Sequence, residues 1–187
     1  MPRKGSSDLP PPIAVFRSAR DADRRIAGVS AAGRAVRALA DAGQGTVRLR
    51  IGDAVPLAPA TRDDIERLRG SAELTLDVGA VEVDSPVPSS WEIIRTTGKP
   101  GDGLVSRWLN RPVSRCITWL VLRIPGALPV HVTLTNALLA LAMIPVLILG
   151  GETGLLLGGI LFQAASVLDG VDGEMARATF RTSPAGA

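Results

Sequence analysis

The feature that most constrains the fold of this chain is a long stretch almost without charge. Between Ile124 and Leu168 the only formally charged residue is Glu152. Glu152 lies in a glycine-rich turn, Gly150–Gly154, which divides the stretch into two apolar runs. The first run, Val132–Leu149, is long enough to cross a hydrocarbon core of about 30 Å at about 1.5 Å per residue. We therefore predict a transmembrane helical hairpin; the alternative is a buried hairpin inside a water-soluble protein.

The second apolar run begins at Leu155, and its helix is expected to continue to about Ala178. Basic residues precede the first run, between Arg107 and Arg123, and follow the second at Arg177 and Arg181. The positive-inside rule then places both ends of the hairpin in the cytosol and the turn outside. The expected location is the cell (inner) membrane, as part of a multi-pass protein whose N-terminal domain and active site are cytosolic. Two helices cannot shield acidic side chains from lipid, so a larger polytopic helical bundle is implied.

The residues just before the hairpin, 104–123, are predicted to form an amphipathic juxtamembrane helix. Arg107, Arg111 and Arg115 recur every four residues, and tryptophan and leucine side chains supply apolar contacts. We expect this helix to lie in the headgroup layer, bent near Pro112, with its arginines toward lipid phosphates. The alternative is a soluble helix with one basic face.

The front half of the chain is of a different kind, because residues 1–100 contain 15 of the 21 basic and 13 of the 18 acidic residues. Residues 1–12 are predicted to be a disordered tail, residues 13–87 a small soluble α/β domain, and residues 88–103 a linker. The pattern of the domain predicts a three-layer arrangement with parallel strand pairing. Its expected elements, in order, are a strand at Ile13–Phe16, a helix at Ala22–Ala42 ended by Gly43, a strand at Thr46–Ile51, a helix from Thr61 to Leu68 capped by Thr61, and a strand at Ala72–Asp77.

Acidic side chains appear where the charge-free stretch ends. Asp169, Asp172, Gly173 and Ala176 share one face of the expected helix. Two carboxylates one turn apart repel each other at a membrane surface, and a hard divalent cation, Mg2+ or Mn2+, would supply the counter-charge. The small residues leave room for a phosphorylated ligand, and Arg177 is placed to pair with a phosphate. The alternative is a helix C-terminus with solvated acids.

The spacing Asp169-x2-Asp172-Gly173-x2-Ala176-Arg177-x8-Gly186 resembles the signature of the CDP-alcohol phosphotransferases (CDP-alcohol phosphatidyltransferases). That signature continues with two further aspartates in the pattern G-x3-D-x3-D, which would lie beyond Ala187. At the start of the first apolar run the family usually shows P-N-x-x-T. Here the corresponding residues are Pro129-Val130-His131-Val132-Thr133, so Val130 replaces the asparagine.

The resemblance implies a reaction and a role for each matched residue. An acceptor alcohol would attack the β-phosphorus of a CDP-linked donor, CMP would leave, and a divalent metal would stabilise the developing charge. Asp169 and Asp172 would bind the metal, and Arg177 a donor phosphate. The remaining matched positions, Gly173, Ala176 and Gly186, would contact the cytidine nucleotide. No residue of this chain takes the role of general base, which belongs to the fourth aspartate, so we expect an amino-terminal fragment without turnover.

The front domain carries a weaker resemblance to sugar-nucleotide-type nucleotidyltransferases, through the segment Ala32–Gly43 followed by a strand. Such a domain is fused in front of the membrane domain in inositol-phosphate cytidylyltransferase/di-myo-inositol phosphate synthase proteins. The glycine-rich nucleotide loop is missing here, and Ser18–Arg25 lacks the glycines that let backbone amides approach phosphates. We therefore expect a degenerate domain, in which Asp53 and Asp77 are surface acids rather than metal ligands.

Several partners follow from this interpretation. The donor is expected to be CDP-inositol or a similar soluble CDP-alcohol, with CDP-diacylglycerol, as in phospholipid biosynthesis, as the alternative. The lipid bilayer and an acceptor alcohol complete the expected partners; family members often pair as homodimers, and no nucleic acid is expected. The single cysteine, Cys116, excludes an internal disulfide and fits a reducing cytosol. A hypothesis of another class is a non-catalytic membrane anchor that presents the front domain at the cytosolic face.

Overall fold

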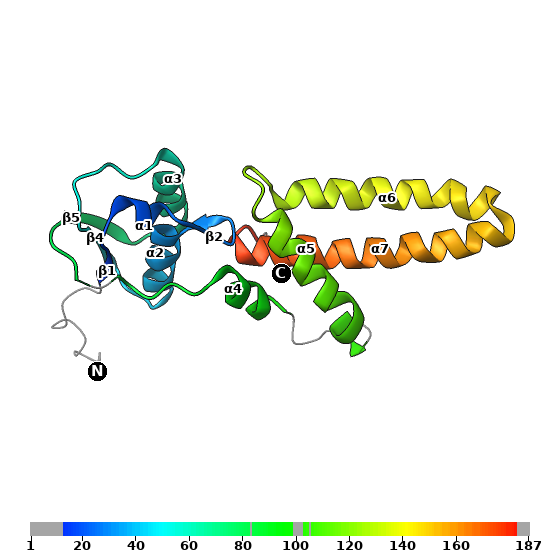
Figure 1. The fold of residues 1–187 in the computed structure, drawn as a ribbon, viewed down its shortest axis with the longest axis horizontal. Helices are drawn as coiled ribbons and strands as arrows, with labels where there is room; N and C mark the ends of the chain where they lie inside the picture. Colours follow the sequence, from blue (N-terminus) through cyan, green and yellow to red (C-terminus); the bar gives the residue numbers. More distant parts are fainter. Residues whose placement is uncertain (1–12, 83, 99–102, 105, 183–187) are drawn as a thin grey trace, which may run out of the picture. The chain divides into compact units, whose positions relative to one another are not determined.

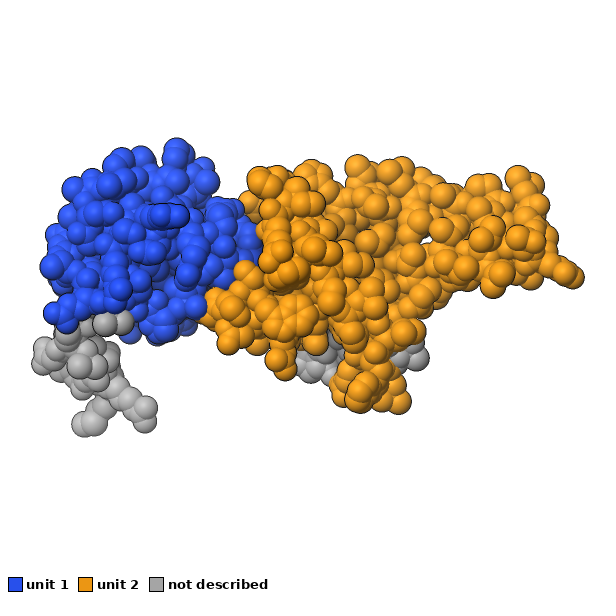
Figure 2. All heavy atoms as spheres, viewed as in Figure 1, with its two compact units in different colours: residues 1–87 blue, residues 88–187 orange. Residues whose placement is uncertain are grey.

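A computed structural model describes residues 13–82, 84–98, 103, 104 and 106–182 (Figure 1). The chain divides into two compact units, residues 1–87 and 88–187, which are coloured separately in Figure 2. The tail predicted for residues 1–12 lies outside the described residues. The first unit is an α/β unit, and the second consists of helices.

Three parallel strands form the sheet of the first unit, in the order β1 (Ile13–Phe16), β4 (Thr46–Ile51), β5 (Glu73–Val78). The crossovers contain α2 (Ala31–Asp41) and α3 (Pro59–Leu68). Each crossover moves one strand further in the same direction across the sheet, so right-handed connections place both helices on the same face. The described residues therefore form two layers, and the three-layer prediction is wrong.

The buried face of the sheet follows the period of two that the sequence shows in the central strand. Val47, Leu49 and Ile51 of β4 are buried, while the alternate residues of this strand are half-buried. On β1, Ala14 and Phe16 are buried in the same way. The three predicted strands are thus confirmed, as is their parallel pairing.

The long helix predicted for Ala22–Ala42 is wrong, because the structure divides this segment. A short helix α1 (Ala19–Asp23) is followed by a two-stranded hairpin, β2 (Arg25–Ile26) and β3 (Val29–Ser30), and only then by α2. Ala27 and Gly28 form the hairpin turn with positive φ values of 45° and 79°. The Ser30 side chain then caps α2 by accepting a hydrogen bond from the Gly33 N–H at 3.2 Å.

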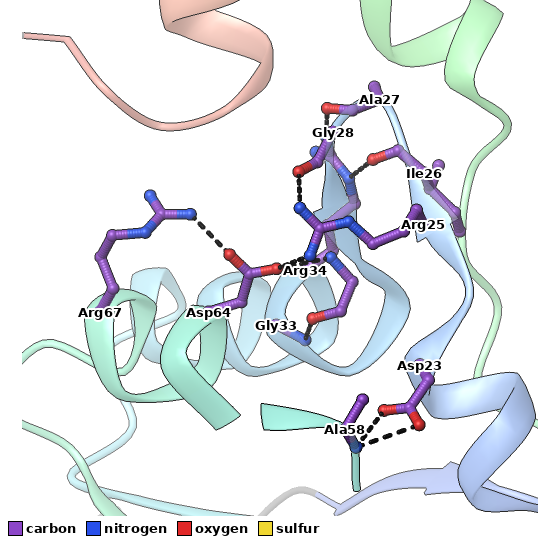
Figure 3. Close-up of polar contacts among 11 residues, drawn as sticks. Asp23, Arg25, Ile26, Ala27, Gly28, Gly33, Arg34, Ala58, Asp64 and Arg67 are labelled. Atoms are coloured by element: carbon purple, nitrogen blue, oxygen red, sulfur yellow. Dashed lines mark hydrogen bonds and ion pairs between the residues drawn. The ribbon is translucent and has the colours of Figure 1, made fainter. Parts of the chain in front are cut away.

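The hairpin is held on α3 by a buried carboxylate, that of Asp64 (Figure 3). Asp64 accepts hydrogen bonds from the Ser30 N–H at 2.9 Å, from Arg25 Nη1 at 2.8 Å and from Arg67 Nη2 at 3.0 Å. Nearby, Arg34 donates to the Ile26 and Ala27 carbonyl oxygens at 2.8 and 2.9 Å. Burial lowers the pKa of Arg34 to about 10, so its guanidinium is still charged at neutral pH.

The acids considered as unlikely metal ligands of this unit have structural partners. Asp53 accepts a hydrogen bond from the Ala19 N–H at 2.9 Å, where α1 begins. Asp77 lies 4.0 Å from Arg50 on the neighbouring strand. Thr61, predicted to cap α3, is buried inside that helix, which begins two residues earlier at Pro59.

The second unit contains α4 (Ser90–Thr96), one turn of π-helix η1 (Ser106–Asn110), α5 (Arg111–Val121), α6 (Pro129–Leu149) and α7 (Gly151–Ala178). Helix α4 lies within the segment predicted as a linker. It begins with a capping box in which Ser89 Oγ accepts from the Glu92 N–H and the Glu92 carboxylate accepts from the Ser89 N–H. The hydrogen bonds that this carboxylate accepts from Ser89 lower the pKa of Glu92. Pro125 and Gly126 lie between the end of α5 and the start of α6.

Helices α6 and α7 form an antiparallel hairpin (Figure 1). Both are long and apolar enough, by length and composition, to cross a membrane, and few of their apolar side chains are buried. Helix α7 continues to Ala178, as predicted, although it begins at Gly151, so the turn is shorter than expected. At the turn between α6 and α7 the two helices approach each other closely. A Cβ on Gly154 would lie only 2.4 Å from the Val146 carbonyl oxygen, so glycine is needed at this position. The larger polytopic bundle remains a prediction.

Candidate functional site

A polar pocket of about 410 Å³ lies between η1, the first turns of α5 and the second half of α7. Residues that carry charge or a hydroxyl or amide group make up most of its lining. They are Ser106, Asn110, Arg111, Ser114, Ser166, Asp169, Asp172 and Arg177, with Gly170 and Gly173 between them. Four of the six site residues predicted from sequence therefore lie on one pocket.

Asp169 and Asp172 lie one helical turn apart on α7, and both line the pocket. The Thr133 hydroxyl of α6 donates a hydrogen bond to Asp172 Oδ2 at 2.7 Å. Within the described part of the chain, Asp169 is exposed and has no hydrogen bond or ion pair. The contact from Thr133 was missed by sequence reasoning, although Thr133 is the threonine of the P-x-x-x-T pattern at the start of α6.

Glycines let neighbouring groups come close to the backbone of α7. A Cβ on Gly173 would lie 3.1 Å from Arg177 Nη1 and 3.2 Å from Nη2, so the missing side chain leaves space for this guanidinium. A Cβ on Gly170 would meet the Ser114 side chain at 3.2 Å. Both distances are tighter than ordinary van der Waals contacts, which explains why small residues occupy this face.

Arg177 reaches from α7 to α4 as well as to the pocket. Its Nε donates to the Thr97 carbonyl oxygen at 2.5 Å, at the C-terminal end of α4. This hydrogen bond to a backbone carbonyl holds the guanidinium in place, and Arg177 lines the pocket together with Asp172 and Gly173. Ala176 is half-buried and does not line the pocket, and Gly186 lies outside the described residues.

A buried ion pair joins α5 to α7. Glu174 has no exposed surface, and its Oε1 lies 3.1 Å from Arg111 Nη1. The prediction that the arginines face lipid phosphates is therefore wrong for Arg111, while Arg107 is exposed. The reason is that the π-helical turn Ser106–Asn110 changes the angular phase between these positions, and that Glu174 supplies a counter-charge.

Polar contacts also connect the π-helical turn to α7. Asn110 Nδ2 donates to the Ser166 hydroxyl at 2.9 Å, and Gln163 Nε2 donates to Asn110 Oδ1 at 2.6 Å. Pro112 is the second residue of α5 and follows directly on the π-helical turn. The hydrogen bonds of Asn110 hold the π-helical turn, which forms part of the pocket wall, in a fixed position against α7.

The donor set suits a hard divalent cation, since carboxylate and hydroxyl oxygens are the ligands that Mg2+ and Mn2+ prefer. Asp169 and Asp172 would hold such an ion, with Thr133 orienting Asp172 from behind. Among the described residues no group of three or more histidine, cysteine, aspartate or glutamate side chains is close enough to hold a metal. Asp169 and Asp172 are therefore the two carboxylates that the described part of the chain could supply to a metal ion at this pocket.

The family model of the CDP-alcohol phosphatidyltransferases matches residues 126–187 of this chain. This match confirms the resemblance predicted from the acidic motif. The matched segment contains all of α6 and α7, and with them both aspartates of the pocket.

Curated relatives carry a more specific description. The chain is 36% identical over 126 residues to the "Bifunctional IPC transferase and DIPP synthase" of Thermococcus kodakarensis, which covers 65% of this chain and 28% of that protein. Proteins of the same description from Aquifex aeolicus (43% over 88 residues; 46% and 19%) and Rubrobacter xylanophilus (40% over 109 residues; 57% and 24%) are also similar. The chain thus spans less than a third of the length of these relatives.

Proposed function

We propose that the pocket on α7 is part of the active site of a membrane-embedded CDP-alcohol phosphotransferase. It would transfer a phosphoalcohol group from a CDP-alcohol to an acceptor alcohol and release CMP. The observation that carries this proposal is the meeting of two carboxylates and two guanidinium groups on one pocket at the end of an apolar helical hairpin. The family match over the same helices supports it.

Each group of the pocket then has a part in binding. Asp169 and Asp172 would bind Mg2+ or Mn2+, which when bound supplies positive charge to the donor's phosphates. Arg177, held by Thr97, would contact a donor phosphate, and Gly173 would allow the nucleotide to lie against the helix. Ala176 and Gly186 are proposed as further nucleotide contacts from the resemblance alone. The signature has two further aspartates, which are not among the residues of this pocket.

The donor is proposed to be a soluble CDP-alcohol such as CDP-inositol, with CDP-diacylglycerol as the alternative. Support for the first comes from the relatives, described as IPC transferases and DIPP synthases, and from the α/β unit in front of the hairpin. The α6–α7 hairpin is proposed to span the cell membrane with the pocket on the cytosolic side, because basic residues flank its open end.

The test of this function is CMP release by membranes that contain the full-length protein, with Mn2+, an acceptor alcohol and either CDP-inositol or CDP-diacylglycerol. We expect release with one donor and its loss when a chelator removes the metal. Release that is independent of metal would contradict the proposed metal site. Absence of release with both donors, in membranes where the protein is folded, would contradict the proposed function and favour a non-catalytic membrane anchor.

A substitution behind the metal ligands tests the same site more finely. We expect Thr133→Ala to raise the Mn2+ concentration for half-maximal CMP release about tenfold, because groups that orient a ligand contribute 10–100-fold to metal affinity. Thr133→Ser keeps the hydroxyl and should restore the wild-type value. Thr135→Ala is the matched control, since its hydroxyl donates to the His131 carbonyl oxygen and not to an acid. Equal Mn2+ dependence in Thr133→Ala and wild type would contradict the assigned contact.

A further inference from the structure

Glu174 is a buried carboxylate with a role that the metal site does not explain. It has no exposed surface and does not line the pocket. Its Oε1 accepts from Arg111 Nη1 at 3.1 Å and from the Ser114 hydroxyl at 2.9 Å, and its Oε2 accepts from the Thr118 hydroxyl at 2.9 Å. All three partners belong to α5, so a single side chain of α7 is bound entirely by one neighbouring helix.

The spacing of these partners fixes the rotation of α5 about its own axis relative to α7. Residues 111, 114 and 118 are three and then four positions apart, which places them on one face of α5. A rotation of α5 by one residue, about 100° for 3.6 residues per turn, would move all three away from the carboxylate. The cost of leaving this carboxylate buried and unpaired therefore opposes any other docking of α5 on α7.

Arg111 and Ser114 connect the Glu174 contact to the pocket, because both residues also line the pocket. A Cβ on Gly170 would lie 3.8 Å from Arg111 Nη1, so the guanidinium lies directly against the part of α7 that separates the two aspartates. The position of this positive charge on the pocket wall is consequently tied to Glu174.

The charges of the pocket indicate what such an arginine binds. Two carboxylates and two guanidinium groups line the pocket, so their formal charges cancel. With the Glu174 carboxylate that pairs with Arg111 counted, a bound divalent cation would leave an excess of one positive charge, which suits a phosphate group as the ligand. A buried ion pair adds little net stability compared with apolar side chains, so specificity of position explains the Arg111–Glu174 pair better than stability does.

We propose that Arg111 is a phosphate-binding residue of this pocket and that Glu174 is its positioning residue, acting through Arg111 by holding α5 in register. This inference depends on the proposed function for the identity of the ligand, but not for the presence of an anion site. The phosphate belongs either to the CDP-linked donor or to a phosphorylated acceptor, which both present the same oxygen atoms to a guanidinium.

The test is equilibrium binding of two probes to the full-length protein in detergent micelles: CDP with Mn2+, and inorganic phosphate with Mn2+. The variants are Glu174→Gln, which keeps the shape and removes the charge, Arg111→Lys, and the double variant. Each single variant should weaken one probe about tenfold, the loss expected for one charged hydrogen bond. Weakened CDP binding assigns the donor's phosphate to Arg111, and weakened phosphate binding with unchanged CDP binding assigns that of the acceptor.

The double variant separates positioning from a general structural role. If Glu174 acts through Arg111, the double variant binds no more weakly than Arg111→Lys, whereas independent roles multiply the two losses. Hydrogen exchange of the α5 amides shows whether the helix is still docked in each variant. Multiplied losses, or unchanged affinity for both probes, would overturn the proposal, as would a wild-type protein that binds neither. Asp172→Ala is included so that failure of the metal-site assignment is seen separately.

Discussion

Membranes containing the full-length protein with Asp169→Asn and Asp172→Asn should release CMP at least about 100-fold more slowly than wild type. The amide groups keep the size of the carboxylates but remove the two negative charges that bring a divalent cation into the pocket. Without that cation the site loses charge stabilisation for the departing nucleotide, an effect of about 10²–10³-fold for a single well-placed group. The measurement is the initial rate of CMP release at saturating Mn2+.

The control for this pair is Glu152→Gln at the opposite end of the hairpin. It also removes an acidic charge from α7, but in the first turn and outside the pocket. Its rate should equal that of wild type. Residual activity of the asparagine pair within a few-fold of the control would show that these carboxylates do not hold the metal.

Gly173→Val should abolish most of the activity by a different route. A Cβ at this position already lies 3.1 Å from Arg177 Nη1, and the two methyl groups of valine extend further into the pocket. Arg177 would have to leave the wall, and the nucleotide could no longer lie against α7. We expect a loss of about 100-fold in kcat/KM for the donor, the size of effect that a misplacement of about 1 Å produces.

Gly159→Val is the matched control for Gly173→Val, because both replace a glycine of α7 by the same β-branched residue. No atom lies within 4 Å of a Cβ on Gly159, so only the helix itself is affected. The control should keep activity within a few-fold of wild type, with the same amount of protein in the membrane. A similar loss in both variants would attribute the effect to the helix rather than to the pocket.

The α5–α7 contact fixes the start of α5, which lines the pocket, against α7. Asn110 bonds to Ser166, and Arg111 and Ser114 bond to Glu174, so each turn at the start of α5 has a partner on α7. On the other side, Thr133 of α6 holds Asp172. Helices α5 and α6 are thus each joined to α7 by polar contacts close to the two aspartates.

The sequence by itself determined those features that depend on local pattern. The charge-free runs predicted two long apolar helices, the second of them continuing to Ala178. A short apolar run predicted β1, and alternation predicted β4 and β5. Four of the predicted site residues also lie on one pocket. The periodicity and the length of an apolar segment are properties of a single helix or strand, so they can be predicted from the residues of that segment alone.

Only the tertiary structure decided which polar side chains meet. Arg111 and Glu174 are 63 residues apart, and Thr133 and Asp172 are 39 apart, so no local period relates them. The burial of Arg111 depends on a π-helical turn and on the docking of α5, and the division of residues 22–42 depends on Asp64 binding the Ser30 N–H from another helix. For the buried groups Arg111, Glu174 and Asp64, the free energy of burying a charge is balanced by a partner distant in sequence, which packing brings near.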